Sequence, residues 1–217
     1  MGSRIWKGKT MIPHLGIDVS RWQGNINWRQ VADDGIEFAI IKAGGSDDGF
    51  YTDRNFYTNV QGCNANNIHC GAYYFVGKKC KSSADGSADA VRFFNIIKDQ
   101  KLDYPVYIDF EAPDRTNKQG NTDACYAFCE QMEAFGYYCG IYASDISGFQ
   151  ERLFIDQLKR FDKWVARYGS TPKYVSKFGM WQTSSSGHVA GIAGRVDTNY
   201  AYHDFDRIIK NKHLNGY

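Results

Sequence analysis

Short apolar runs alternate with amphipathic segments along most of this chain, and this alternation constrains the fold more than any other feature. Each run is too short and too apolar to be a surface helix. The runs read "HLGIDVS", "FAIIKAG", "CGAYYFVG", "PVYIDFE", "YCGIYAS" and "KWVARYG", followed by "KFGMWQTSS" and "RVDTNYAY". Strands that alternate with helices are typical of a parallel sheet, and this chain repeats the pattern often enough to close the sheet into a barrel. The predicted class is therefore α/β.

The segments between these runs carry apolar residues at helical spacing. "INWRQVADDG" predicts a helix that Gly35 ends, and "DRNFYTNVQGCNANN" predicts one that Asp53 caps at its N-terminus. The other predicted helices are "SADAVRFFNIIKDQ", "TDACYAFCEQMEAFG", "FQERLFIDQLK" and "HDFDRIIKNK".

A length of 217 residues permits one large domain or two small ones. No Pro-rich or Ser/Gly-rich linker divides the chain, which has only 4 prolines. We therefore expect one domain, at residues 13–217, after a loosely attached extension at residues 1–12.

The charge pattern argues against two classes of partner. The formal net charge is +2, and the lysines and arginines are spread along the chain without a basic block, so we expect no nucleic-acid partner. No stretch approaches the roughly 20 apolar residues of a membrane span, so we expect no membrane partner. The start, "MGSRIWKGKTMIPHLG", lacks the apolar centre of a secretory signal peptide.

The cysteines do not predict a disulfide framework. There are 6, and a chain of this size builds a core without such bonds, so we favour buried free thiols. Cys63 and Cys70, which flank a turn, are the best candidate pair if one forms. There is no CxxC motif and no histidine at ligand spacing beside the cysteines, so we expect no zinc, no other metal and no cofactor.

Acidic residues follow several of the predicted strands. Asp18 ends one, Asp109 and Glu111 end another, and Asp197 lies in a third. In a parallel barrel the reactive face is formed by the carboxyl ends of the strands. A single aspartate in such a position commonly caps a helix or pairs with a lysine, but four carboxylates at strand ends favour a shared acidic cleft.

Side-chain parity predicts which way these acids point. Residues two apart on a strand project to the same side, so Tyr107, Asp109 and Glu111 share one face. Ile108 and Phe110 are apolar and suit the outer face against helices, which leaves the two acids facing inward.

Clustered carboxylates suggest a particular chemistry. Like charges in a desolvated cleft raise one another's pKa, so one acid stays protonated while its neighbour is ionised. That division of roles is what cleavage of a glycosidic bond requires. A Mg²⁺ or Ca²⁺ site is the competing use of such a cluster, but nothing in the sequence indicates the phosphate or extra carbonyl ligands that it needs.

Taken together, these motifs resemble those of the glycoside hydrolase family 25 lysozymes, or Chalaropsis-type muramidases. The resemblance runs from about Leu15 to Tyr202. It rests on "GIDVSRWQG", "FAIIKAG", "CGAYYF", "YPVYIDFE", "GIYAS", "WVARY" and "GIAGRVDTN", in this order and spacing. The family implies a flattened, irregular (β/α) TIM-like barrel. It also implies hydrolysis of the β-1,4 bond between N-acetylmuramic acid and N-acetylglucosamine in peptidoglycan.

The resemblance also implies residue roles. Glu111 matches the general acid and Asp109 its partner, while Asp18 and Asp197 match two outer acids that tune this pair. Positions that line the groove or lie close to the acids match Tyr73, Tyr142, Trp164, Gln182 and Lys42. Tyr74 stands where many members have histidine, and Thr183 where a tyrosine commonly follows the glutamine. We expect Trp22 and Trp28 to pack in the core or on a helix face instead of contacting sugar.

We therefore expect a retaining N-acetylmuramidase that acts on the bacterial cell wall. With no signal peptide visible, the expected route is synthesis in a host cytoplasm and release by a phage holin. Two alternatives stay open. One is a chitin-type hydrolase, whose family also uses an Asp-x-Glu strand end, and the other is a non-catalytic cell-wall-binding module.

Overall fold

The computed structural model describes residues 5–6, 9–10 and 13–217. Strands β1 (Ile5–Trp6) and β2 (Lys9–Thr10) pair antiparallel, with Ile5 opposite Thr10. The rest of the predicted extension, residues 1–12, lies outside the described residues, so the boundary before residue 13 stays a prediction.

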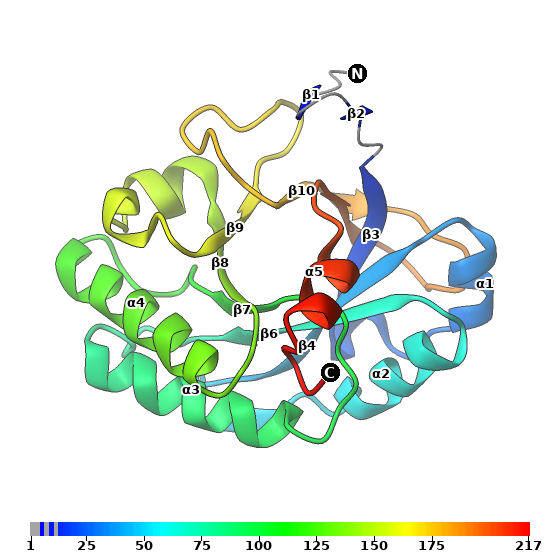
Figure 1. Cartoon of the computed structure of the whole chain (residues 1–217), viewed down its shortest axis with the longest axis horizontal. Coiled ribbons are helices and arrows are strands. Elements are labelled where there is room, and N and C mark those ends of the chain that lie inside the picture. Colours follow the sequence, from blue (N-terminus) through cyan, green and yellow to red (C-terminus); the bar gives the residue numbers. More distant parts are fainter. Residues whose placement is uncertain (1–4, 7–8, 11–12) are drawn as a thin grey trace.

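The centre of the fold is a closed barrel of eight strands (Figure 1). The barrel order is β3-β11-β10-β9-β8-β7-β6-β4, and pairing of β3 with β4 closes it. Its strands are β3 (His14–Val19), β4 (Phe38–Gly45), β6 (His69–Phe75), β7 (Val106–Asp109), β8 (Cys139–Ser144), β9 (Asp162–Ala166), β10 (Met180–Gly187) and β11 (Val196–Ala201). A short strand, β5 (Tyr51–Thr52), extends the sheet beside β4. The predicted α/β barrel is confirmed.

One strand makes this barrel irregular. From β3 through β4 and on to β10 all neighbours are parallel, but β11 is antiparallel to both β10 and β3. The start of β11 therefore lies at the same end of the barrel as the carboxyl ends of the other strands. This reversal brings residues near the start of β11 to the predicted reactive face.

Helices cover the outside of the barrel, with α3 and α4 side by side (Figure 1). They are α1 (Trp28–Asp33), α2 (Phe56–Ala65), α3 (Ser83–Ile97) and α4 (Lys118–Ala134), and a further helix, α5 (Phe205–Asn211), lies at one end of the barrel. Three shorter turns are η1 (Arg21–Gln23), the π-helix η2 (Asp145–Gln150) and η3 (Ile155–Leu158). None of the described helices is long and apolar enough to cross a membrane.

Two local predictions are wrong. The segment "FQERLFIDQLK" forms no α-helix, because η2 and η3 bury Phe149 and Leu158 from separate turns, so tertiary packing overrides the helical spacing. The N-cap of α2 is Asn55, not Asp53. The buried Asp53 carboxylate instead accepts hydrogen bonds from the backbone N–H groups of Asn55 and Arg21, at 2.9 and 3.0 Å.

The apolar residues inside the barrel and those outside it form two separate clusters. The predicted alternation of side chains along β7 is confirmed. Tyr107 belongs to the inner cluster, whereas Ile108 and Phe110 belong to the outer cluster beneath the helices. The adjacent tyrosines of β6 also divide, because Tyr73 packs against the inner cluster and Tyr74 lies in the outer one.

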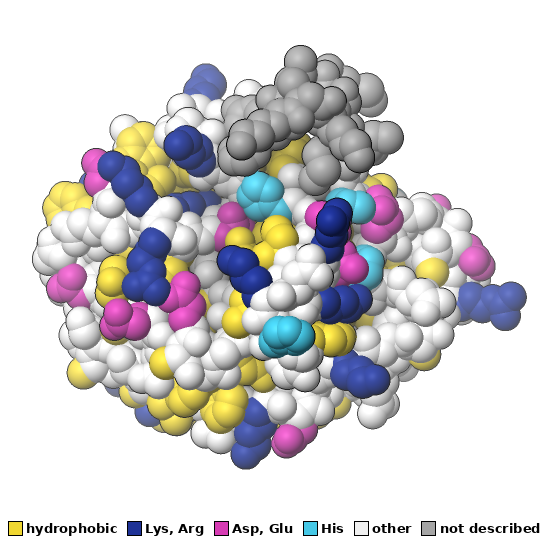
Figure 2. All heavy atoms as spheres, in the orientation of Figure 1, with side chains coloured by type: hydrophobic (Ala, Val, Ile, Leu, Met, Phe, Trp, Pro, Cys, Tyr) yellow, Lys and Arg dark blue, Asp and Glu magenta, His cyan; other side chains and the backbone are white. Residues whose placement is uncertain are grey.

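The amino-terminal end of the barrel is closed by α5, which lies across the centre of Figure 1. Phe205 of α5 is fully buried and contacts the rings of Tyr104 and Tyr138. Figure 2 shows this end of the molecule, with histidine and basic side chains gathered near its centre. The acids of the predicted active site therefore belong to the other end.

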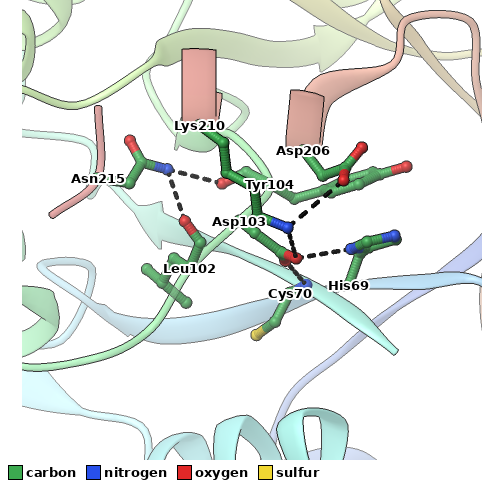
Figure 3. A network of polar contacts seen from close by, with 8 residues as sticks. All are labelled: His69, Cys70, Leu102, Asp103, Tyr104, Asp206, Lys210 and Asn215. Atoms are coloured by element: carbon green, nitrogen blue, oxygen red, sulfur yellow. Dashed lines mark hydrogen bonds and ion pairs between the residues drawn. The ribbon is translucent and has the colours of Figure 1, made fainter. Parts of the chain in front are cut away.

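A polar network ties α5 and the residues after it to this end of the barrel (Figure 3). Asp103 accepts a hydrogen bond from the backbone of Cys70 and contacts His69 Nδ1 at 2.6 Å and Lys210 Nζ at 3.5 Å. The buried Asn215 side chain donates to the carbonyls of Leu102 and Tyr104, both at 3.0 Å (Figure 3).

The remaining predictions on burial have mixed outcomes. All six cysteines are buried free thiols, so the favoured interpretation is confirmed and no Cys63–Cys70 bond forms. Trp28 is buried as predicted, at 5% exposure. The prediction for Trp22 is wrong, because its side chain is 78% exposed on η1.

We predict that Asn215→Ala lowers the free energy of unfolding by roughly 2–4 kcal/mol, because each buried polar group left without a partner costs about 1–3 kcal/mol. The variant also places alanine at a φ of 57°, where asparagine is better tolerated. Urea denaturation measures the change. Asn211→Ala, at the exposed end of α5, is the matched control, and equal stability of the two variants would contradict the prediction.

Candidate functional site

Two of the predicted acids lie opposite each other on neighbouring strands. Asp18 of β3 is paired in register with Asp197 of the antiparallel β11. Side chains of directly opposed residues have Cβ atoms about 4.5–5.5 Å apart. Two carboxylates are therefore held close together by the backbone itself.

The second pair comes from β7. Asp109 is the last residue of this strand and is 5% exposed, while Glu111 follows just beyond it and is exposed. Asp109 interacts electrostatically with both Glu111 and Asp18, and Glu111 interacts with Asp197. The structure thus brings all four predicted acids together at one end of the barrel.

A cavity of about 330 Å³ opens beside Glu111. Its walls come from the ends of β8 and β9 and from η2, and they include Tyr142, Ser144, Ser147, Arg167 and Tyr168. A hollow of similar size, about 360 Å³, lies at the opposite end around His14 and His69, far from the acids. Of these two cavities, the one beside Glu111 combines a carboxyl group with tyrosine walls.

Gln182 of β10 connects the acids to the tyrosines of this cavity. Its Nε2 donates to Asp18 Oδ2 at 2.8 Å and to Asp197 Oδ2 at 3.2 Å. Its Oε1 accepts from the hydroxyl groups of Tyr142 and Tyr168, at 2.9 and 2.8 Å. One buried amide therefore fixes two carboxylates and two tyrosines relative to one another.

A second amide supports the same acid from below. Asn199 of β11 donates from Nδ2 to Asp18 Oδ2 at 2.9 Å and accepts from the indole N–H of Trp164 at 2.8 Å. Trp164 packs on Tyr142, with ring centroids 4.4 Å apart, and is only 1% exposed. Trp164 therefore lies beneath the site as a support, and its predicted contact with substrate stays a prediction.

Burial raises the pKa of both members of the Asp18–Asp197 pair, and repulsion adds to the shift at Asp18. For Asp18 burial is the largest cause and the Asp197 charge adds to it, against the hydrogen bonds from Asn199 and Gln182. Burial also raises the pKa of Asp197, whereas its hydrogen bond with Asp18 lowers it. A hydrogen bond between two carboxyl groups requires one of them to hold the proton.

Asp109 is also buried. Burial is the largest cause that raises its pKa well above the usual range, and Glu111 adds to the shift, while Lys42 opposes it. Asp109 Oδ1 is buried without a hydrogen-bond partner among the described residues. Burial lowers the pKa of Lys42, although attraction to Asp109 holds it up.

The carboxyl group of Glu111 also has a raised pKa. Loss of solvent against the cavity wall is the largest cause, and Asp197 adds to it, while Lys42 and Arg152 oppose it. Since the side chain keeps an exposed surface, its carboxyl group is accessible from the cavity. The site therefore combines an accessible carboxyl group whose pKa is raised with buried carboxyl groups that lie close to it.

The sequence reasoning missed three residues of this site. Tyr168 lies within the "WVARY" stretch but was given no role, and Asn199 lies two residues after Asp197. Asp145, the first residue of η2, accepts from Arg167 Nη1 at 3.2 Å and from the backbone N–H groups of Lys173 and Val175. No periodicity distinguishes Asp145, whose partners follow it by more than 20 residues in the chain.

The described residues contain no group of three histidine, cysteine, aspartate or glutamate side chains arranged to hold a metal ion. The chemistry that this geometry supports is proton transfer from a carboxylic acid, with a buried carboxylate facing the reacting centre.

Comparison with known proteins identifies relatives with the same fold. The chain is 26% identical over 189 residues to the autolytic lysozyme of Clostridium acetobutylicum. The alignment covers 84% of this chain and 54% of that protein. This chain therefore spans about half the length of that relative.

Solved structures agree. The CTP1L endolysin superposes with a TM-score of 0.78 at 28% identity, over 91% of this chain and 70% of that one. The modular autolysin LytC of Streptococcus pneumoniae, in complex with a synthetic peptidoglycan ligand, has a TM-score of 0.74 at 28% identity, over 88% of this chain and 47% of that one. The model of the family described as "Glycosyl hydrolases family 25" matches residues 17–192, most of the described barrel, and the chain belongs to this family.

Proposed function

We propose that this protein is a peptidoglycan hydrolase, an N-acetylmuramidase that cleaves the β-1,4 bond between N-acetylmuramic acid and N-acetylglucosamine. The observation that carries the proposal is the placement of Glu111, an accessible acid with a raised pKa, beside the buried carboxyl group of Asp109. Membership of a glycosyl hydrolase family supports it, as does the resemblance to a lysozyme.

Glu111 acts as the general acid in this proposal. A carboxyl group that is protonated near neutral pH donates its proton to the bridging oxygen as the glycosidic bond breaks. The leaving sugar departs as an alcohol, and positive charge develops on the anomeric carbon of the muramic acid ring. Glu111, now ionised, then accepts a proton from the water that completes hydrolysis.

Asp109 meets the developing positive charge from the other side. It does so either directly or by accepting a hydrogen bond from the 2-acetamido N–H while the acetamido carbonyl attacks the anomeric carbon. The unpartnered Asp109 Oδ1 supports the second route, because a substrate N–H would satisfy a buried acceptor. Both routes give retention of the anomeric configuration.

The outer acids and the groove residues prepare this centre. Asp18 and Asp197, joined through Gln182, keep the cleft acidic and oppose ionisation of their neighbours. Lys42 lies near Asp109 and Glu111 and limits how far their pKa values rise. Tyr73, Tyr142 and Trp164 form the inner aromatic packing against which the acids are held.

The proposed partner is peptidoglycan of the bacterial cell wall, and the proposed site of action is that wall. The autolysin that shares this fold was solved with a synthetic peptidoglycan ligand, which supports the choice of substrate. The endolysin likeness supports release from a host cytoplasm through a phage holin. A chitin-type activity remains the second candidate on the Asp109–Glu111 spacing alone.

Glu111→Gln removes the proton and keeps the size of the side chain. We predict that this variant clears a suspension of Gram-positive cell walls at less than about one hundredth of the wild-type rate, since general acid catalysis contributes about 10²–10⁴-fold. Its circular dichroism and melting temperature stay those of the wild type. A variant that keeps a tenth of the activity would show that Glu111 is not the acid.

The anomeric configuration of the first product tests the route. We predict that proton NMR during the first minutes of hydrolysis detects the β-anomer of the new reducing end, followed by slow mutarotation. The same experiment on Asp109→Asn checks that the signal depends on this site. The α-anomer as first product would contradict retention.

Asp109→Asn is predicted to stabilise the fold while it abolishes activity. Because the pKa of Asp109 is raised in the folded state, the wild type loses stability as the pH rises above the ordinary value of 3.8. At pH 7 the variant should melt roughly 2–4 °C higher, the shift expected for about 1 kcal/mol in a chain of this size. The difference should vanish below pH 3.8, and a variant that melts lower at pH 7 would contradict it.

A further inference from the structure

The turn η1 forms part of the rim around the acids. It begins three residues after Asp18 of β3, and both of its ends are fixed. The Ser20 hydroxyl accepts from the backbone of Trp22, and Gln23 Oε1 accepts from the backbone N–H of Ser20 at 2.9 Å. These hydrogen bonds hold the backbone of η1 in place.

Contacts to two neighbouring segments place η1 at the mouth of the barrel. The backbone N–H of Arg21 donates to Asp53 Oδ2, and Asp53 is itself bonded to the end of β4 at Ala43. Gln23 Nε2 donates to the carbonyl of Arg195, which lies just before β11 and two residues from Asp197. The turn therefore spans the rim between β4 and β11, on the side of the acids.

The packing of the fold does not explain the positions of two side chains of this turn. Trp22 is 78% exposed, although burying an aromatic ring of this size is favourable. The guanidinium carbon of Arg21 lies 5.1 Å from the centre of the Trp22 ring and 5.5 Å from that of Tyr51. Among the described residues Arg21 forms no ion pair, so a cation is held between two rings without a carboxylate.

A series of contacts links the guanidinium group of Arg21 to the acidic centre. The ring of Tyr51 is close to both Arg21 and Lys42, whose Nζ is 5.7 Å from the centre of this ring. Lys42 in turn interacts with Asp109. Successive contacts thus link Asp109 to an ammonium group, a tyrosine, a guanidinium group and an exposed indole ring.

We propose that Arg21 and Trp22 form a subsite for an acidic amino sugar, in which the indole ring stacks on the sugar and the guanidinium group binds its carboxylate. This inference rests on the proposed function and names what distinguishes the substrate. Peptidoglycan carries carboxylates, on the lactyl group of muramic acid or on the stem peptide attached there, whereas chitin carries none. A fixed guanidinium fork is well suited to a carboxylate.

The two residues then contribute differently. Trp22 contacts the apolar face of a sugar ring, which chitin and peptidoglycan share, and so contributes affinity for both. Arg21 contributes only where a carboxylate is present, and so contributes discrimination. The proposed subsite makes selection of the wall glycan over chitin depend on a residue outside the four acids.

The test uses the full chain with Glu111→Gln, which binds without hydrolysis, and isothermal titration calorimetry with three probes. These are a peptide-free tetrasaccharide of alternating N-acetylglucosamine and N-acetylmuramic acid, the same tetrasaccharide with stem peptides, and chitotetraose. Arg21→Gln and Trp22→Ala are added singly. Arg21→Lys and Trp22→Phe are the conservative variants, and Tyr217→Ala, an exposed aromatic near Lys210 at the other end of the barrel, is the matched control.

We expect Arg21→Gln to weaken binding of a carboxylate-bearing probe about tenfold, as loss of a charge-assisted hydrogen bond does, and to leave chitotetraose unchanged. Trp22→Ala should weaken the binding of all three probes. Trp22→Phe should lose less affinity than Trp22→Ala. A loss confined to the peptide-free probe identifies the lactyl carboxylate, and a loss confined to the peptide-bearing probe identifies the stem peptide. Either result supports the subsite.

The inference is overturned if the Arg21→Gln variant binds both wall probes as tightly as its parent does. It is also overturned if the substitution weakens binding of chitotetraose as much as binding of the wall probes. Failure of the proposed function is a separate result. It is shown by a wild-type protein that releases no reducing ends from cell walls, a measurement that does not involve Arg21 or Trp22.

Discussion

The burial of four neighbouring carboxyl groups at one mouth of the barrel is the constraint on which the proposed activity depends. Asp18, Asp109 and Asp197 are held where burial raises the pKa of each, and Glu111 shares their field. Such a cluster favours the protonated form of its members because full ionisation of neighbouring buried carboxyl groups is costly. The cost falls on the folded state, and the rest of the barrel has to supply the stability that offsets it.

The reversed strand β11 creates this constraint. In an all-parallel barrel each strand contributes its carboxyl end to the reactive face. Because β11 runs the other way, Asp197 near its start lies directly opposite Asp18 near the end of β3. Gln182 and Asn199 then bond to these carboxylates from within the same sheet.

Much of the fold could be predicted from the sequence because strand and helix periodicity are local properties. The parity of Tyr107, Ile108 and Phe110 followed from the apolar character of alternate residues, and the structure confirms it. The helix predicted around Phe149 to Leu158 was wrong, because its apolar spacing is satisfied by two separate turns packed on the barrel. Local spacing does not reveal which neighbour a residue packs against.

The site divides in the same way. Strand ends indicated the acids, but Tyr168 and Asp145 enter it through loops, and the exposure of Trp22 depends on how η1 is tied to Asp53 and Arg195.

The most direct measurement of the central claim is a carbon-13 NMR titration of the Glu111 side-chain carboxyl group in the free protein. A barrel mouth that keeps this group protonated gives a midpoint clearly above the ordinary value of 4.5. A midpoint at or below 4.5 would contradict the assignment of Glu111 as the proton donor.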